Sequence, residues 1–348
     1  MYRDIDGDLC HQSLLKNLKG KLSFDENNDF SDWKKAVYDK LYELLKLDAI
    51  SQNSCPINVV VEEEIDMGTY TQIRFTYDSE KDCTVPCYLL IPNTNKKSYP
   101  LVICLQGHTN GMHISINKMI FENDSPKNES KFATQAVAHG YAALCIEQRG
   151  MGERRSIRSF PNKMPIPRGH QCAMNSLTAL QLGRNTIGER VWDVQKGIDA
   201  MSYFPKIDTD KIMILGTSGG GTASFYSACI DSRIKYCAPS CSFCSYKTSI
   251  MNIEHCVCNF VPDICLWFEM EDLSCLIAPR PISVLTGLLD EIFPIDGVRN
   301  SYKTLEKIYE KAGASDKCKL IEMPKAHWFC ADIAWEEIER QIKTLGWK

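Results

Sequence analysis

Apolar and polar positions follow two different patterns along the chain. Residues 57–92 alternate in strand fashion, with a polar turn at Asp78 to Asp82, which predicts opening antiparallel strands. From residue 101 onward the pattern changes to nearly continuous apolar runs, which are typical of strands buried on both faces of a parallel sheet. These runs lie at Leu101–Leu105, Tyr141–Ile146, Ile212–Leu215, Ile234–Ala238, Ile282–Leu289 and Leu320–Met323.

Segments with a helical period separate these runs, and the longest cover about 175–203, 296–313 and 332–345. Alternating strands and helices predict an α/β fold with a mostly parallel central sheet and helices on both faces. We expect this domain to span residues 56–348. The stretch 241–275, rich in cysteine and aromatic residues, is the expected cap insertion.

The first part of the chain, residues 1–55, is predicted to form an N-terminal helical appendage. Apolar residues there recur every three or four positions, which marks one face of an amphipathic helix. They are Trp33, Val37, Leu41, Leu44 and Leu45.

Composition narrows the classes of function. The chain has 348 residues, of which 44% are hydrophobic and 24% charged, so it can bury a sizeable core. The net charge is −4 and no basic stripe is interleaved with aromatic residues, which argues against nucleic-acid or anionic-membrane partners. Because the N-terminus carries early acidic residues and no run approaches a membrane span, we expect a cytoplasmic protein.

Seventeen cysteines are present, and several lie inside predicted strands and helices. Without an export signal we expect reduced thiols that pack as small apolar side chains. One group offers metal-type ligands, namely Cys241-x-x-Cys244 followed by His255-Cys256-Val257-Cys258. Its spacing matches no known zinc knuckle, and Cys-x-Cys is tight for one tetrahedral ion, so buried thiols and no metal are the expectation.

The first candidate catalytic sequence surrounds Ser218. The apolar run that ends at Leu215 leads directly into Gly216-Thr217-Ser218-Gly219-Gly220, a Gly-x-Ser-x-Gly sequence, and small residues then open a helix. This strand, turn and helix context is that of a nucleophile elbow, in which a tight turn lifts the serine hydroxyl above the sheet. The alternative is a glycine-rich turn with an idle serine.

A base and an acid follow Ser218 in the chain. His327 comes just after the last apolar run, where an imidazole can reach the serine as general base. Asp290 ends another apolar strand, so its carboxylate would be held rigidly enough to orient that imidazole. Glu291 and Asp296 are its rivals, although Asp296 has the position of a first-turn acid in the following helix.

An oxyanion hole needs backbone N–H groups aimed at the developing negative charge. After a nucleophile elbow, the first of these N–H groups belongs to the residue that follows the serine, here Gly219. The second N–H group is expected from His108, in the turn after the first parallel strand.

These residues together resemble the α/β-hydrolase branch that contains acetyl-xylan esterases, cephalosporin-C deacetylases and dienelactone-hydrolase-related esterases. The resemblance covers roughly residues 80–345, and the segment from Gly287 to Pro294 around Asp290 carries it most specifically. Many relatives have His-Gly-Tyr where this chain has Gln106-Gly107-His108, so the resemblance does not carry over a substrate.

The resemblance implies a serine carboxylesterase that hydrolyses short-chain acyl esters, with acetyl esters foremost and an acetylated carbohydrate as a candidate substrate. Such an enzyme needs no cofactor, and relatives often form homo-oligomers. Trp267 and Phe268, in the insertion, are the candidate walls of the substrate pocket. Two alternatives stay open: a prolyl-oligopeptidase-like serine peptidase, and a non-catalytic binding protein on a hydrolase scaffold.

Overall fold

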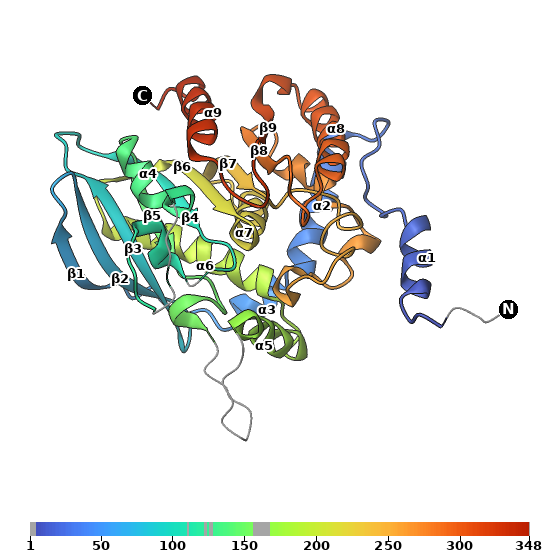
Figure 1. Cartoon of the computed structure of the whole chain (residues 1–348), viewed down its shortest axis with the longest axis horizontal. Helices are drawn as coiled ribbons and strands as arrows, with labels where there is room; N and C mark the ends of the chain where they lie inside the picture. Colours follow the sequence, from blue (N-terminus) through green and yellow to red (C-terminus); the bar gives the residue numbers. More distant parts are fainter. Residues whose placement is uncertain (1–4, 110, 122–123, 125–127, 156–167, 348) are drawn as a thin grey trace, which may run out of the picture.

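A nine-stranded sheet forms the centre of the protein in a computed structural model, which describes residues 5–109, 111–121, 124, 128–155 and 168–347 (Figure 1). The strands lie in the order β1-β2-β3-β5-β4-β6-β7-β8-β9. Pairings are antiparallel from β1 to β5 and parallel from β5 to β9 along this order. The strands are β1 (Val60–Asp66), β2 (Tyr70–Glu80), β3 (Cys83–Pro92), β4 (Tyr99–Leu105), β5 (Ala142–Ile146), β6 (Ile207–Thr217), β7 (Ile234–Ser240), β8 (Ile282–Gly287) and β9 (Cys318–Met323).

Burial along the strands explains the two sequence patterns. Every residue of β4, β5 and β8 is buried, as expected for strands covered on both faces. Strand β1, at the edge of the sheet, is exposed along its whole length. The predicted mostly parallel sheet with antiparallel opening strands is therefore confirmed.

Helices cover both faces, as predicted from the alternating elements (Figure 1). Alternate residues of β4 and β6 point to opposite faces, so the core divides into two apolar clusters. Helices α4 (Phe132–Ala138) and α9 (Ala331–Thr344) contribute to one cluster. The other cluster receives side chains from α2 (Phe30–Leu44), α3 (Leu47–Ser51), α6 (Thr186–Ala200), α7 (Gly219–Ile230) and α8 (Ile295–Lys311).

The single helix predicted over 175–203 is wrong, because the structure has two helices there. Helix α5 (Arg168–Gln181) ends before a turn in which Gly183 has φ +70°. Asn185 then caps α6, since its side chain accepts a hydrogen bond of 2.9 Å from the N–H of Gly188. A glycine after one helix and an asparagine before the next are the usual signals of such a break.

Near the N-terminus, the predicted amphipathic face is found in α2, where Trp33, Val37, Leu41 and Leu44 are buried. The indole N–H of Trp33 donates to the carbonyl of Leu22 at 2.9 Å. The short helix α1 (Leu9–Asn17) has no buried residue, and residues 1–4 of the predicted appendage lie outside the described range. No helix among the described residues has both the length and the apolar character that crossing a membrane requires.

Between β7 and β8 lies the segment that the sequence marks as an insertion. It contains only short 3-10 turns, η5 (Val257–Asn259), η6 (Ile264–Leu266) and η7 (Met270–Leu276). Backbone hydrogen bonds tie it to the N-terminal segment, from the N–H of Lys21 to Leu266 at 3.1 Å and from Leu22 to Trp267 at 2.7 Å. One part of this insertion, residues 253–256, faces the cavity described below.

Candidate active site

Ser218 occupies the sharp turn between β6 and α7, with φ 52° and ψ −127°. A positive φ is strained for serine, at a cost of about 1–3 kcal/mol, so the surrounding backbone must hold it. The N–H of Ser218 donates to the carbonyl of Ser240 at 2.9 Å, and its own carbonyl accepts from the N–H of Thr222 at 2.9 Å. A Cβ on Gly220 would lie 2.2 Å from the carbonyl oxygen of Leu105, which explains the glycine there.

His327 lies in the loop after β9 and is paired with Asp290 in the loop after β8. The Nδ1–H of His327 donates to Oδ2 of Asp290 at 2.8 Å, and the Asp290 side chain is fully buried. The other carboxylate oxygen accepts from the N–H groups of Ile292 at 2.9 Å and Phe293 at 3.1 Å. Because Asp290 fixes Nδ1 as the protonated nitrogen, Nε2 of His327 is left as a proton acceptor.

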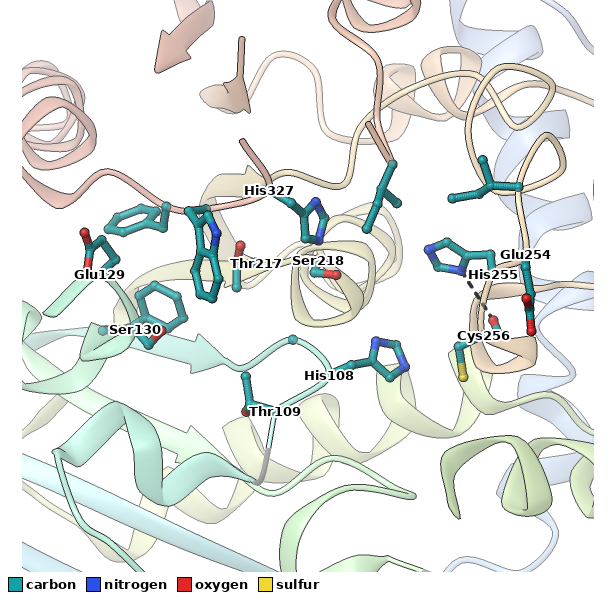
Figure 2. Close-up of a pocket in the computed structure, with 16 residues that line it drawn as sticks. His108, Thr109, Glu129, Ser130, Thr217, Ser218, Glu254, His255, Cys256 and His327 are labelled. Atoms are coloured by element: carbon teal, nitrogen blue, oxygen red, sulfur yellow. Dashed lines mark hydrogen bonds between the residues drawn. The ribbon is translucent and has the colours of Figure 1, made fainter. Parts of the chain in front are cut away.

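Ser218 and His327 line the same cavity, which has a volume of about 490 Å³. Figure 2 shows the imidazole of His327 directed toward the side chain of Ser218, with His108 and His255 across the cavity. The structure thus brings together the three side chains that the sequence assigned to nucleophile, base and acid.

The two predicted backbone donors are also neighbours. A Cβ on Gly219 would lie 2.9 Å from Cε1 of His108, and a Cβ on Gly107 would lie 3.0 Å from Cβ of Ser218. The turn after β4 therefore packs directly against the serine. As the first residue of α7, Gly219 has an N–H that no carbonyl of the helix can accept.

Trp267 and Phe268 do not line this cavity, so their predicted role as pocket walls is wrong for the cavity beside Ser218. Phe268 is fully buried in the main apolar cluster. Trp267 lies under two ammonium groups, with the Nζ of Lys40 at 4.0 Å and that of Lys21 at 4.6 Å from its ring centroid. The apolar walls come instead from Phe132, Ile253, Ile292, Trp328 and Phe329.

Sequence reasoning missed the first of these walls because Phe132 lies in α4, far along the chain from the serine. Trp328 and Phe329 could have been found, since they directly follow His327.

Behind the turn after β4, a buried carboxylate holds the backbone in place. Glu147, after β5, accepts hydrogen bonds from the N–H groups of Met112 at 3.1 Å and Glu153 at 3.3 Å. Burial is the largest influence on this group and raises the pKa of Glu147 to about 7. Arg149, in the same turn, pairs with the buried Asp193 at 2.9 Å, which ties this turn to α6.

We expect the stability of the protein to depend on pH through Glu147. Between pH 4.5 and about 7 the folded protein keeps the proton that the unfolded chain has released, so stability falls as pH rises through this window. Relative to the variant Glu147→Gln, which cannot titrate, the wild type should lose about 3 kcal/mol of unfolding free energy across it. Urea unfolding at a series of pH values measures this difference, and a constant difference would contradict the raised pKa.

The cysteines of the insertion separate into different places. Cys244 lies beside Thr248, with its sulfur 3.1 Å from Oγ1. Cys241 lies close to the pair of Asp290 and His327, and burial raises the pKa of its thiol to about 12. Cys256 and Cys258 instead meet two residues from elsewhere, His108 and Cys172. The CxxC pair and the CxC pair of the sequence therefore do not form one cluster.

Known proteins resemble this chain in sequence or in structure. Over 263 residues the chain is 27% identical to "Putative hydrolase YtaP" of Bacillus subtilis, covering 75% of this chain and 83% of that protein. A "putative acetyl xylan esterase" of Bacteroides fragilis superposes with a TM-score of 0.83 at 17% identity, covering 98% of this chain and 96% of that one. A glucuronoyl esterase from Solibacter usitatus gives a TM-score of 0.64 at 15% identity, with 94% and 97% coverage.

These structural matches establish the α/β-hydrolase fold that the nucleophile elbow predicted. The model of the Abhydrolase family matches residues 3–331, which include Ser218, Asp290 and nearly all of the sheet and its helices. The chain belongs to the Abhydrolase family.

Proposed function

We propose that the protein is a serine carboxylesterase. The observation that carries this proposal is the hydrogen bond from His327 to the buried Asp290. His327 lines the same cavity as Ser218, which lies on a turn with a strained positive φ. A serine, a base and an orienting carboxylate in these relative positions perform acyl transfer on unrelated folds.

In the reaction, Oγ of Ser218 attacks the carbonyl carbon of the ester while Nε2 of His327 takes its proton. The N–H groups of Gly219 and His108 hold the negative oxygen of the tetrahedral intermediate. His327 then gives the proton to the departing alcohol, which leaves Ser218 acylated. Water, deprotonated by the same imidazole, attacks the acyl group and releases the acid.

The class of substrate is supported by the relatives. The two solved structures named above are described as a "putative acetyl xylan esterase" and a "glucuronoyl esterase", names that point to an ester of a carbohydrate as the substrate of this protein. The cavity is lined by apolar side chains, among them Phe132, Trp328 and Phe329, and by polar ones, among them Glu254 and His255. The apolar side chains can pack against an acyl group, and the polar ones can bind a hydroxylated alcohol.

A fluorophosphonate probe tests the proposal directly, because it labels only an activated serine. Labelling of the wild type and its absence in Ser218→Ala would support an acting nucleophile, whereas an unlabelled wild type would favour the binding-protein alternative. Comparing aryl esters with aminoacyl-arylamides then separates the esterase from the peptidase. Hydrolysis of amides as fast as esters would overturn the esterase proposal.

Acyl length is the second expected property. We expect kcat/KM for acetyl and propionyl esters to exceed that for octanoyl esters, because each methylene that overfills an aromatic-walled site costs roughly 1–3 kcal/mol. Trp328 is 43% exposed, so the variant Trp328→Ala removes a wall without emptying the core and should raise the ratio of octanoyl to acetyl hydrolysis. A kcat/KM that rose steadily with acyl length in the wild type would contradict this prediction.

A further inference from the structure

Four metal-type side chains from three distant segments converge beside the proposed active site. His108 lies in the turn after β4, Cys172 in α5, and Cys256 and Cys258 at η5 of the insertion. One ligand atom from each residue lies within 4.8 Å of all the others. Nε2 of His108 is 3.1 Å from Sγ of Cys258. We propose that these four residues bind a structural zinc ion, which goes beyond the proposed esterase function.

The spacing of the four atoms suits one tetrahedral ion. Zinc binds thiolate sulfur at about 2.3 Å and imidazole nitrogen at about 2.0–2.1 Å, so tetrahedral ligand atoms lie about 3.5–3.8 Å apart. Atoms that are all within 4.8 Å of one another need only small side-chain movements to reach that geometry. Three cysteines and one histidine are also an established ligand set for structural zinc.

The charges around the cluster also favour a bound zinc ion. Arg190 is buried, and its guanidinium donates from Nη1 to Sγ of Cys258 at 3.4 Å and from Nη2 to Sγ of Cys172 at 3.2 Å. A buried guanidinium is costly unless an anion compensates it. A zinc ion with three thiolate ligands carries a net charge of −1, which the positive charge of Arg190 balances. Three protonated thiols would be neutral, so the guanidinium of Arg190 would then have no anionic partner among these cysteines.

The outer contacts resemble those that orient metal ligands. Besides Arg190, the side-chain N–H of Asn259 donates to Sγ of Cys258 at 3.7 Å. Hydrogen bonds to coordinated sulfur stabilise the thiolate form and fix its direction. Because four protein ligands fill a tetrahedral shell, no position remains for water, and the ion holds structure and takes no part in ester hydrolysis.

The site would join the insertion and α5 to the turn that packs against Ser218. The ring of His108 is the ligand, while its backbone N–H is the proposed oxyanion donor on the cavity side. An ion bound to this ring therefore fixes the donor without touching the substrate.

Metal content of the full-length protein tests the proposal. Protein prepared in zinc-supplemented medium and without chelators should contain about one zinc per chain by plasma mass spectrometry. Cys172→Ser and Cys258→Ser should lose nearly all of it. Cys244→Ser is the matched control, because Cys244 is buried in the same insertion but contacts Thr248, and this variant should retain its zinc.

Cobalt exchanged into the wild type gives a second readout that does not depend on whether the serine variants fold. Tetrahedral cobalt with three thiolate ligands should show intense visible absorption bands and thiolate-to-metal charge-transfer bands. In a separate measurement, removing the metal with a strong chelator should lower the melting temperature of the wild type. Zinc-free wild type, zinc retained in both serine variants, or a disulfide joining two of the three cysteines in a peptide map would each overturn the proposal. None of these measurements requires an active esterase.

Discussion

Replacing Ser218 with alanine should reduce kcat for an aryl acetate by about 10⁴–10⁶. The alanine has no nucleophilic oxygen, and in the proposed mechanism the hydroxyl oxygen of Ser218 is the atom that attacks the ester. His327→Ala should cause a loss of the same order, because a serine hydroxyl without a base is a weak nucleophile. The double variant should lose little more than either single variant, since the two groups act on one step. Steady-state kinetics of the three variants measures these losses.

A matched control lies in the same helix. Ser227 is buried in α7, and its hydroxyl has no hydrogen-bond partner among the described residues. Ser227→Ala should therefore keep kcat close to that of the wild type, while reporting any general effect of serine removal on α7. Near-normal activity of Ser218→Ala, or losses that multiply in the double variant, would show that Ser218 and His327 do not act as one unit.

The fold and its proposed nucleophile could be predicted because their signals are local. The signals for the turn at Ser218 all lie within one stretch of the chain: a buried strand before it, glycines around it and small residues after it. The turn can close only because the glycines leave room for the neighbouring backbone. His327 and Asp290 were predicted from their positions at the ends of apolar runs that follow Ser218, which needs only the ends of strands to be located. Both ends were predicted to within a few residues.

Long-range packing explains what the sequence could not indicate. Trp267 looks like a pocket wall because it is large and lies in an insertion, but the N-terminal segment pairs with this part of the insertion and Lys40 covers the ring. No residue near Trp267 in the sequence indicates the pairing with the N-terminal segment or the contact with Lys40.

The cysteine and histidine cluster is the clearest example. Sequence spacing detects metal ligands only when they lie close together in the chain, and here that favoured Cys241 and Cys244 as partners of the later cysteines. The structure instead joins Cys258 to His108 and Cys172, which are separated from it by several strands and helices. The topology of the sheet brings these segments to one end of the strands, and periodicity does not encode that proximity.

Asp290→Asn should reduce kcat by about 10⁴, because it changes which nitrogen of His327 carries the proton while the ring stays in place. The carboxylate accepts from Nδ1–H of His327 with one oxygen and from the N–H groups of Ile292 and Phe293 with the other. In asparagine, one of these positions must become an NH₂ group. Because the two backbone donors need an acceptor, the NH₂ group should face His327, which would then carry its proton on Nε2 and could not accept one from Ser218.

Asp296→Asn is the comparison that tests the choice of acid. Asp296 lies in the first turn of α8, its side chain is 93% exposed, and its carboxylate lies 3.9 Å from Nη1 of Arg299. An exposed pair of this kind contributes about 0–1 kcal/mol, so kcat should change little. Glu291 is exposed as well, whereas Asp290 is buried against the imidazole. Measured at several pH values, kcat should fall in Asp290→Asn across the whole range; a large loss in Asp296→Asn with a mild one in Asp290→Asn would assign the acid to Asp296.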